Sequence, residues 1–180
     1  MLDILFAAFL GFALGSIPFG LILTRAAGLG DVRQIGSGSV GAPHVLRTGN
    51  KGLALATVLL DAGKGVAAVL IAKSAWPEAA NLMGIAAVGA VVGHCYTPWL
   101  AFKGGKGFAT AAGVCGALSW PLLLICFGVW AIAIAITRIS SVGSLSAVSA
   151  AAVVTFVAPL FGVEELAPLV LPMIAVQVSV

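Results

Sequence analysis

The sequence predicts an all-α membrane protein, a compact bundle of about seven transmembrane helices. Its composition is the first reason: 61% of the 180 residues are hydrophobic and only 8% are charged, whereas soluble domains carry about 25% charged residues. The second is the mean hydropathy of +1.18, with apolar residues gathered in runs long enough to cross a bilayer. A chain of this length cannot hide so much apolar surface in a soluble core. Most soluble enzyme classes are therefore excluded.

Seven apolar segments are the expected helices, and together they make residues 1–180 a single membrane domain. They are Leu2–Leu23, Leu53–Ala72, Ala80–Leu100, Phe108–Leu118, Trp120–Thr137, Val142–Leu160 and Leu166–Val180. The fourth is short for a crossing helix, and only Ser119-Trp120-Pro121 separates it from the fifth. Pro18 is expected to break or kink the first helix, because proline cannot continue the backbone hydrogen bonds. Gly89-x-x-x-Gly93 is interpreted as a close helix-packing motif.

Charged residues predict the orientation of the bundle. Cations occupy alternate connections: Arg25, Arg33, Arg47 and Lys51 in the first, Lys103 and Lys106 in the third, Arg138 in the fifth. Acidic residues occupy the opposite ends: Asp3, Glu78, Glu164 and Glu165. Because basic residues accumulate on the cytoplasmic side, the N-terminus is expected outside and the odd-numbered connections inside.

Several other functions are unsupported by the residue pattern. The net charge is +3, but the basic residues are scattered among apolar runs and form no continuous face for nucleic acid. With only His44 and His94 and no H-E-x-x-H motif, no metal site is expected. Gly36-x-Gly38-x-x-Gly41 has dinucleotide-binding spacing, but no strand precedes it. The cysteines form no C-x-x-C pair and are interpreted as small buried apolar residues: Cys95, Cys115 and Cys126.

Glycine-rich connections on the expected inner side carry the candidate phosphate-binding residues. Around Ser37, Gly36 and Gly38 would expose backbone N–H groups to an anion, and Arg47 supplies a planar cation. Lys103-Gly104-Gly105-Lys106-Gly107 runs directly into the short fourth helix, whose N-terminus also favours anions. The fifth connection continues after Arg138 into Ser140–Ser146, which offers hydroxyl donors. An ordinary helix N-cap explains this stretch equally well.

Asp61 and Lys64 are three residues apart in an expected helix, so a mutual ion pair inside the bundle is the favoured interpretation. This pair also belongs to a longer series of motifs. In chain order these are Gly15-Ser16-Ile17-Pro18-Phe19-Gly20, Gly36-Ser37-Gly38 with Arg47-Thr48, Leu60-Asp61-x-x-Lys64-Gly65, Gly93-His94, and Phe102-Lys103-Gly104-Gly105-Lys106-Gly107-x-Ala109-Thr110. Over nearly the whole chain, the series resembles the bacterial acyl-phosphate-dependent glycerol-3-phosphate acyltransferases, the PlsY family.

The resemblance implies a seven-helix enzyme of the bacterial inner membrane with its site facing the cytoplasm. It would transfer a fatty acyl group from acyl phosphate to the 1-hydroxyl of glycerol 3-phosphate, forming lysophosphatidic acid beside membrane lipid. No cofactor is implied, and a monomer is expected. The implied catalytic residues are Ser37, Arg47 and Lys106. The implied substrate-binding residues are Gly36, Gly38, Lys103, Gly104, Gly105, Gly107, Ser141 and Ser144.

The sequence departs from the family pattern in two places. Ser39, Pro43 and His44 replace Asn, Thr and Asn in the first motif, and the chain ends Gln177-Val178-Ser179-Val180 without the family's basic C-terminal stretch. Two alternatives therefore stay open. One is a catalytically impaired or truncated relative, and the other is a small anion transporter that uses the same loops.

Overall fold

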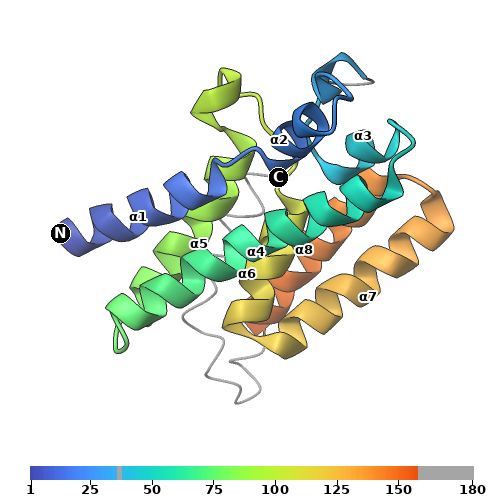
Figure 1. Cartoon of the computed structure of the whole chain (residues 1–180). Helices are drawn as coiled ribbons and strands as arrows, with labels where there is room; N and C mark the ends of the chain where they lie inside the picture. The colour runs from blue at the N-terminus through green and yellow to red at the C-terminus, as the bar shows by residue number, and fades with distance from the viewer. Residues whose placement is uncertain (36–37, 158–180) are drawn as a thin grey trace.

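The computed structural model describes residues 1–35 and 38–157, and these contain helices and no strand (Figure 1). The α-helices are α1 (Leu2–Gly15), α2 (Phe19–Ala26), α3 (Ala42–Leu46), α4 (Lys51–Ala75), α5 (Ala80–Cys95), α6 (Phe108–Leu118), α7 (Trp120–Thr137) and α8 (Ser140–Val157). Two short 3₁₀ turns, η1 (Val32–Gln34) and η2 (Pro98–Leu100), lie in the connections. The predicted all-α fold is confirmed.

Among the described residues, four helical segments are long and apolar enough to cross a membrane: Leu2–Ala26, Lys51–Ala75, Ala80–Leu100 and Trp120–Thr137. Two shorter apolar helices, α6 and the stretch Ser141–Val157 of α8, lie beside them. The predicted short fourth helix is confirmed at its expected bounds. The expected seventh segment, Leu166–Val180, lies outside the described residues.

The first apolar segment is interrupted where Pro18 predicts it. Helix α1 ends at Gly15, and α2 begins at Phe19 with Pro18 as its N-cap residue. The break leaves backbone carbonyl groups of residues 16 and 17 without helical partners at a depth where water is scarce. Such groups need hydrogen-bond donors from elsewhere. Lys64 of α4 and Thr97 of the α5–α6 connection supply them, as described below.

Glycines set the closest helix contacts. A Cβ atom placed on Gly89 of α5 would lie 2.7 Å from the Ala8 carbonyl oxygen of α1. A Cβ atom on Gly93 would overlap the Phe12 carbonyl oxygen, so the predicted packing motif is confirmed. Gly113 of α6 likewise packs directly on the backbone of Ala62 in α4. These contacts place α5 against α1 and α6 against α4.

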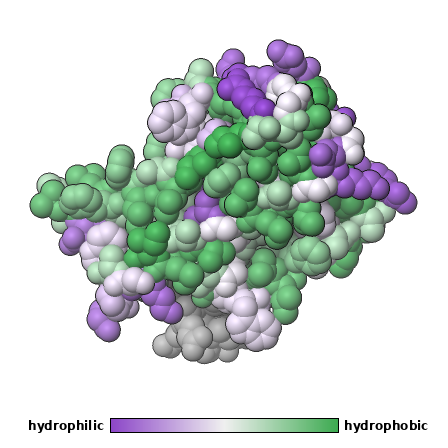
Figure 2. Space-filling model, viewed as in Figure 1, coloured by the Kyte–Doolittle hydropathy of each residue, from purple (hydrophilic) through white to green (hydrophobic). Residues whose placement is uncertain are grey.

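The outer surface is that of a membrane protein. Large apolar side chains are exposed along the helices, and Figure 2 shows apolar residues over the middle of the molecule with hydrophilic residues gathered toward its ends. Helix α7 is the clearest case, because its exposed residues include Leu124, Phe127, Ile132 and Ile136. A face of this kind is stable against lipid and would aggregate in water.

Two element boundaries differ from the prediction. Helix α5 ends at Cys95 rather than at Leu100, because the chain turns through η2, which begins at Pro98. Of the two interpretations of Ser140–Ser146, the ordinary helix start is the one observed, because these residues form the start of α8, two residues before the expected Val142. Arg138, in a left-handed conformation with φ 58°, ends α7 and allows α8 to begin almost at once.

Candidate functional site

The connections predicted to carry the chemistry lie at one end of the bundle, called here the loop end: residues 27–35 and 38–50, residues 96–107 and the α7–α8 junction at residues 138–139. Figure 1 shows them opposite the turns that follow α4 and α6. Helices α4, α6 and α8 all begin at the loop end. The residues that enter the site therefore come from parts of the chain far apart in sequence.

Asp31 neutralises two of the arginines at the loop end. Its carboxylate lies 2.9 Å from the Arg25 guanidinium and also pairs with Arg33, whose backbone N–H donates to it as well. Because the Arg33 side chain donates hydrogen bonds to it, the pKa of the Asp31 carboxyl lies well below its ordinary value. Asp31 is thus ionised at any physiological pH. Arg25 and Arg33 are therefore poorly placed to recruit an anionic substrate.

Arg47 and Lys106 differ from those arginines. Both are exposed, and within residues 1–35 and 38–157 neither has a salt bridge. The positive charges of both cations act on the imidazole of His44. Burial lowers the pKa of His44, and the charges of Arg47 and Lys106 lower it further. Both cations therefore lie within electrostatic range of His44 at the loop end. Lys103, also exposed, lies in the same connection as Lys106.

The glycines between the two lysines have a different role from the predicted one. The N–H groups of Gly104 and Gly105 donate to the carbonyl oxygens of Cys95 and His94, at 2.9 and 3.1 Å, at the end of α5. These two N–H groups are therefore not open to an anion, contrary to expectation. Side chains at either position would overlap His94. The glycines allow the loop to close tightly over the end of α5.

Gly107 and the N-terminus of α6 retain the properties expected of an anion site. Gly107 has φ 76°, a left-handed conformation that favours glycine, and it is the N-cap residue of α6. No side chain caps this helix. Its first N–H groups thus face the loop end next to Lys106, where the helix dipole also favours negative charge.

The remaining predicted site residues have the following positions. Gly36 and Ser37 lie outside the described residues, and Gly38 has φ 78°, a turn conformation suited to glycine. Ser141 is half-buried and Ser144 is buried, both near the start of α8 rather than in a loop. The start of α8 is at the loop end with the other candidates.

A buried polar cluster lies beside the loop of residues 103–107. The sequence predicted only its ion pair. The predicted ion pair is confirmed: Lys64 Nζ lies 2.8 Å from Asp61 Oδ1, and both side chains are almost wholly buried. His94 Nδ1 lies 3.6 Å from the same oxygen and 3.3 Å from Thr110 Oγ1. Helix spacing could reveal the pair within α4. It could not reveal His94, which comes from α5.

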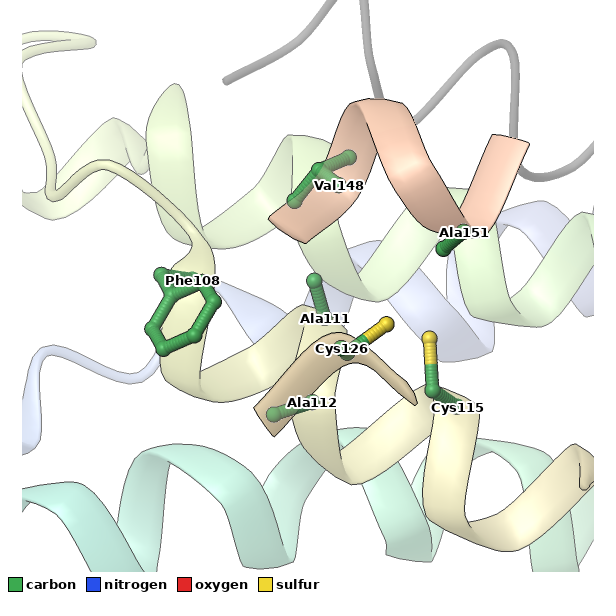
Figure 3. Close-up of a pocket in the computed structure, with 7 residues that line it drawn as sticks. All are labelled: Phe108, Ala111, Ala112, Cys115, Cys126, Val148 and Ala151. Carbon is green, nitrogen blue, oxygen red and sulfur yellow. The ribbon is translucent and has the colours of Figure 1, made fainter. Parts of the chain in front are cut away.

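An apolar cavity opens beside the first turn of α6, between α6, α7 and α8 (Figure 3). It is lined by Phe108, Ala111, Ala112, Cys115, Cys126, Val148 and Ala151. Phe108 directly follows Gly107. The cavity therefore starts next to the segment of residues 103–107, called here the glycine-lysine loop. All three cysteines are buried and none forms a disulfide, as their interpretation as small apolar residues predicts.

Comparisons with known proteins agree with this arrangement. The family model for glycerol-3-phosphate acyltransferase matches residues 5–180. A glycerol-3-phosphate acyltransferase of Erythrobacter litoralis is 60% identical over 151 residues, which are 84% of this chain and 75% of the relative. The corresponding protein of Paramagnetospirillum magneticum is 53% identical over 83% of this chain and 74% of its own length.

Solved structures show the same fold. The crystal structure of PlsY (YgiH), an integral membrane glycerol 3-phosphate acyltransferase, in its glycerol 3-phosphate form superimposes with a TM-score of 0.87 at 32% identity. The lysophosphatidic acid form of PlsY gives a TM-score of 0.85 at 31% identity. Each match covers 98% of this chain and 85% of the other. On this evidence, the chain belongs to the glycerol-3-phosphate acyltransferase family of integral membrane proteins.

Proposed function

We propose that the protein transfers a fatty acyl group from acyl phosphate to the 1-hydroxyl of glycerol 3-phosphate, forming lysophosphatidic acid and inorganic phosphate. One observation carries the proposal: Arg47 and Lys106 both lie close enough to His44 for their charges to act on it, and Lys106 lies two residues before the start of α6, which no side chain caps. Exposed cations at one end of an apolar bundle suit substrates that carry a phosphate on a fatty acyl group. PlsY, solved with glycerol 3-phosphate and lysophosphatidic acid, shares the fold.

The chemistry asks the protein chiefly for position and charge. Acyl phosphate is a mixed anhydride, so the glycerol hydroxyl can attack its carbonyl carbon without a covalent enzyme intermediate. The C–O bond to phosphate breaks as the new ester bond forms, and the departing phosphate takes up the hydroxyl proton. Arg47 and Lys106 would hold the two phosphates together and stabilise the negative charge that moves to the leaving phosphate. Ser37 is assigned from its motif as a group that orients a phosphate or passes a proton.

The remaining binding assignments follow from the same placement. Lys103 adds a third cation near Lys106, and Gly107 keeps the start of α6 open to a phosphate. Ser141 and Ser144 would contribute from the start of α8. The acyl chain would extend into lipid along the exposed apolar faces of the helices. We expect a monomer in a bacterial inner membrane with the loop end facing the cytoplasm, because these elements come from a single chain.

Product formation in detergent tests the proposal. Purified protein receives palmitoyl phosphate and radiolabelled glycerol 3-phosphate, and labelled lysophosphatidic acid is followed by thin-layer chromatography. Arg47→Ala and Lys106→Ala should each lower kcat/KM by roughly 100-fold, the loss typical of one charge-stabilising group. Lys51→Ala is the matched control, since it removes an exposed cation from the same end of the bundle and should leave kcat/KM nearly unchanged.

Three outcomes would contradict the proposal. Absence of product from folded protein would indicate a catalytically impaired relative. Product formed with acyl-CoA but not with acyl phosphate would overturn the assigned donor. Uptake of labelled glycerol 3-phosphate into sealed vesicles without chemical change would instead indicate a transporter.

A further inference from the structure

The buried cluster of Asp61, Lys64 and His94 has no role in the chemistry described so far. These side chains are exposed to only 4%, 3% and 6%, and all belong to elements embedded in the bundle. Ionisable groups inside a membrane protein are costly, and a well-packed apolar set of side chains would avoid that cost. The contacts of the cluster show what it joins.

On one side the cluster holds the break in the first transmembrane segment. Lys64 Nζ donates a hydrogen bond of 2.8 Å to the carbonyl oxygen of Ile17, which the break leaves without a helical partner. A second link from the α5–α6 connection reaches the same break. Thr97 Oγ1 donates to the Ser16 carbonyl oxygen at 2.6 Å, and Trp99 Nε1 lies 3.2 Å from Ser16 Oγ.

On the other side the cluster supports the glycine-lysine loop. The N–H of Gly105 donates to the backbone carbonyl of His94 at 3.1 Å. The Cα of Gly105 packs on the His94 ring so closely that a Cβ atom there would overlap Nε2. On the same ring, Nδ1 faces Asp61 and Thr110. The imidazole is thus held between the ion pair in α4 and the backbone of the residue that precedes Lys106.

We propose that Asp61, Lys64 and His94 are positioning residues that fix the glycine-lysine loop, and with it Lys106, relative to the α1–α2 break. The inference rests on the proposed function, because Lys106 is taken as a catalytic cation there. Asp61 and Lys64 orient the His94 ring. The ring fixes the position of Gly105, and Gly105 in turn fixes the position of the Lys106 backbone. None of the three side chains touches the substrate. An error of about 1 Å in a catalytic group can cost roughly 100-fold in rate.

Steady-state kinetics of the full chain in detergent form the first test. His94→Ala should lower kcat about 10- to 100-fold with little change in the KM for glycerol 3-phosphate. His94→Asn should recover part of the loss, because its amide can make a polar contact with Asp61 or Thr110 that alanine cannot make. In a Lys106→Ala background, His94→Ala should cost almost nothing more. A variant that merely lowered the amount of folded enzyme would reduce kcat by the same factor in both backgrounds, and that result would overturn the proposal.

Hydrogen–deuterium exchange is the second test, and it needs no activity. His94→Ala should speed exchange in the peptide spanning residues 103–110, where the Gly104 and Gly105 N–H groups bond to α5. Thr155→Val is the matched control, because Thr155 is fully buried and its hydroxyl bonds only within α8. It should leave exchange in that peptide unchanged. Unchanged exchange in His94→Ala would overturn the proposal.

The two tests separate failure of this inference from failure of the proposed function. If the wild-type protein forms product and the His94 variants match it in kcat, the positioning role is wrong and the enzyme assignment stands. If the wild-type protein forms no product, the enzyme assignment fails. Faster exchange in His94→Ala would then still support the structural link, and unchanged exchange would reject it.

Discussion

The ammonium group of Lys64 lies 2.8 Å from the carbonyl oxygen of Ile17, across the gap that Pro18 opens between α1 and α2. The same ammonium pairs with Asp61 at 2.8 Å and lies 5.7 Å from the centre of the Phe19 ring. One cation thus contacts both a carbonyl group that the helix break exposes and the buried carboxylate of Asp61. The broken helix and the buried charge depend on each other.

Removal of one partner should therefore destabilise the protein strongly. Lys64→Met leaves Asp61 charged in an apolar bundle and removes the Lys64 hydrogen bond to the Ile17 carbonyl oxygen, for which we expect a loss of about 3–5 kcal/mol. Asp61→Asn with Lys64→Met removes both charges and should recover part of that loss. Thermal unfolding in detergent measures the order of the variants. Lys73→Met is the control, since Lys73 is exposed on the same helix. Equal stability of both Lys variants would contradict the account.

Hydropathy and single residues predicted much of the fold. Apolar runs predicted the helices near their observed positions, Pro18 predicted the break, and Gly89-x-x-x-Gly93 predicted the α1–α5 contact. The basic residues also predicted which connections lie together. These features depend on the local sequence or on a single spacing, so a reader of the sequence can find them.

The parts that failed depend on contacts between distant segments. The N–H groups of Gly104 and Gly105 were expected to be open to an anion. Their acceptors are carbonyl groups at the end of α5, which only the folded chain brings close to this loop. Ser141 and Ser144 were expected in a loop, but the left-handed conformation at Arg138 lets α8 begin at Ser140. In each case the local sequence permits both conformations, and tertiary contacts select one.

Two glycine substitutions should change stability in opposite directions. Gly107 has φ 76°, so Gly107→Ala should cost about 1 kcal/mol and disturb the start of α6. Gly63 lies within α4 with open space around it, so Gly63→Ala should stabilise the helix by about 0.5–1 kcal/mol. Thermal unfolding of the two variants beside wild type measures both effects. A stabilising Gly107→Ala would show that the positive φ is not needed.

His44 should make the protein less stable as the pH falls. Burial lowers the pKa of His44 below 6.5, and the charges of Arg47 and Lys106 lower it further. Above pH 6.5 the side chain is neutral in both the folded and the unfolded chain and contributes nothing. Below pH 6.5 the unfolded chain binds the proton more readily, so the free energy of unfolding decreases. Between pH 7 and pH 5, wild-type Tm should fall more steeply than that of His44→Asn.

Phosphate gives this prediction a control. An anion bound between Arg47 and Lys106 would offset the charges that act on His44, so saturating glycerol 3-phosphate should reduce the difference in slope between the two proteins. Identical slopes for wild type and His44→Asn without ligand would show that His44 titrates as it does in the unfolded chain.

The direction in which the bundle crosses the membrane can be tested with single cysteines. Lys51 is the first residue of α4, which begins at the loop end, whereas the exposed Glu78 lies in the turn that follows α4 at the opposite end. Because cations are retained on the cytoplasmic side, a membrane-impermeant maleimide should label Glu78→Cys in intact bacteria with a permeabilised outer membrane. It should label Lys51→Cys only after the inner membrane is opened.

The native chain is the control for this labelling, because its three cysteines are buried and should stay unreactive in both conditions. The result also bears on the enzyme. Glycerol 3-phosphate is a charged metabolite that does not cross lipid unaided, so a site fed from the cytoplasm requires the loop end to face inward. Labelling of Lys51→Cys in intact cells would place Arg47 and Lys106 outside. Neither the orientation nor the cytoplasmic supply of substrate could then be correct.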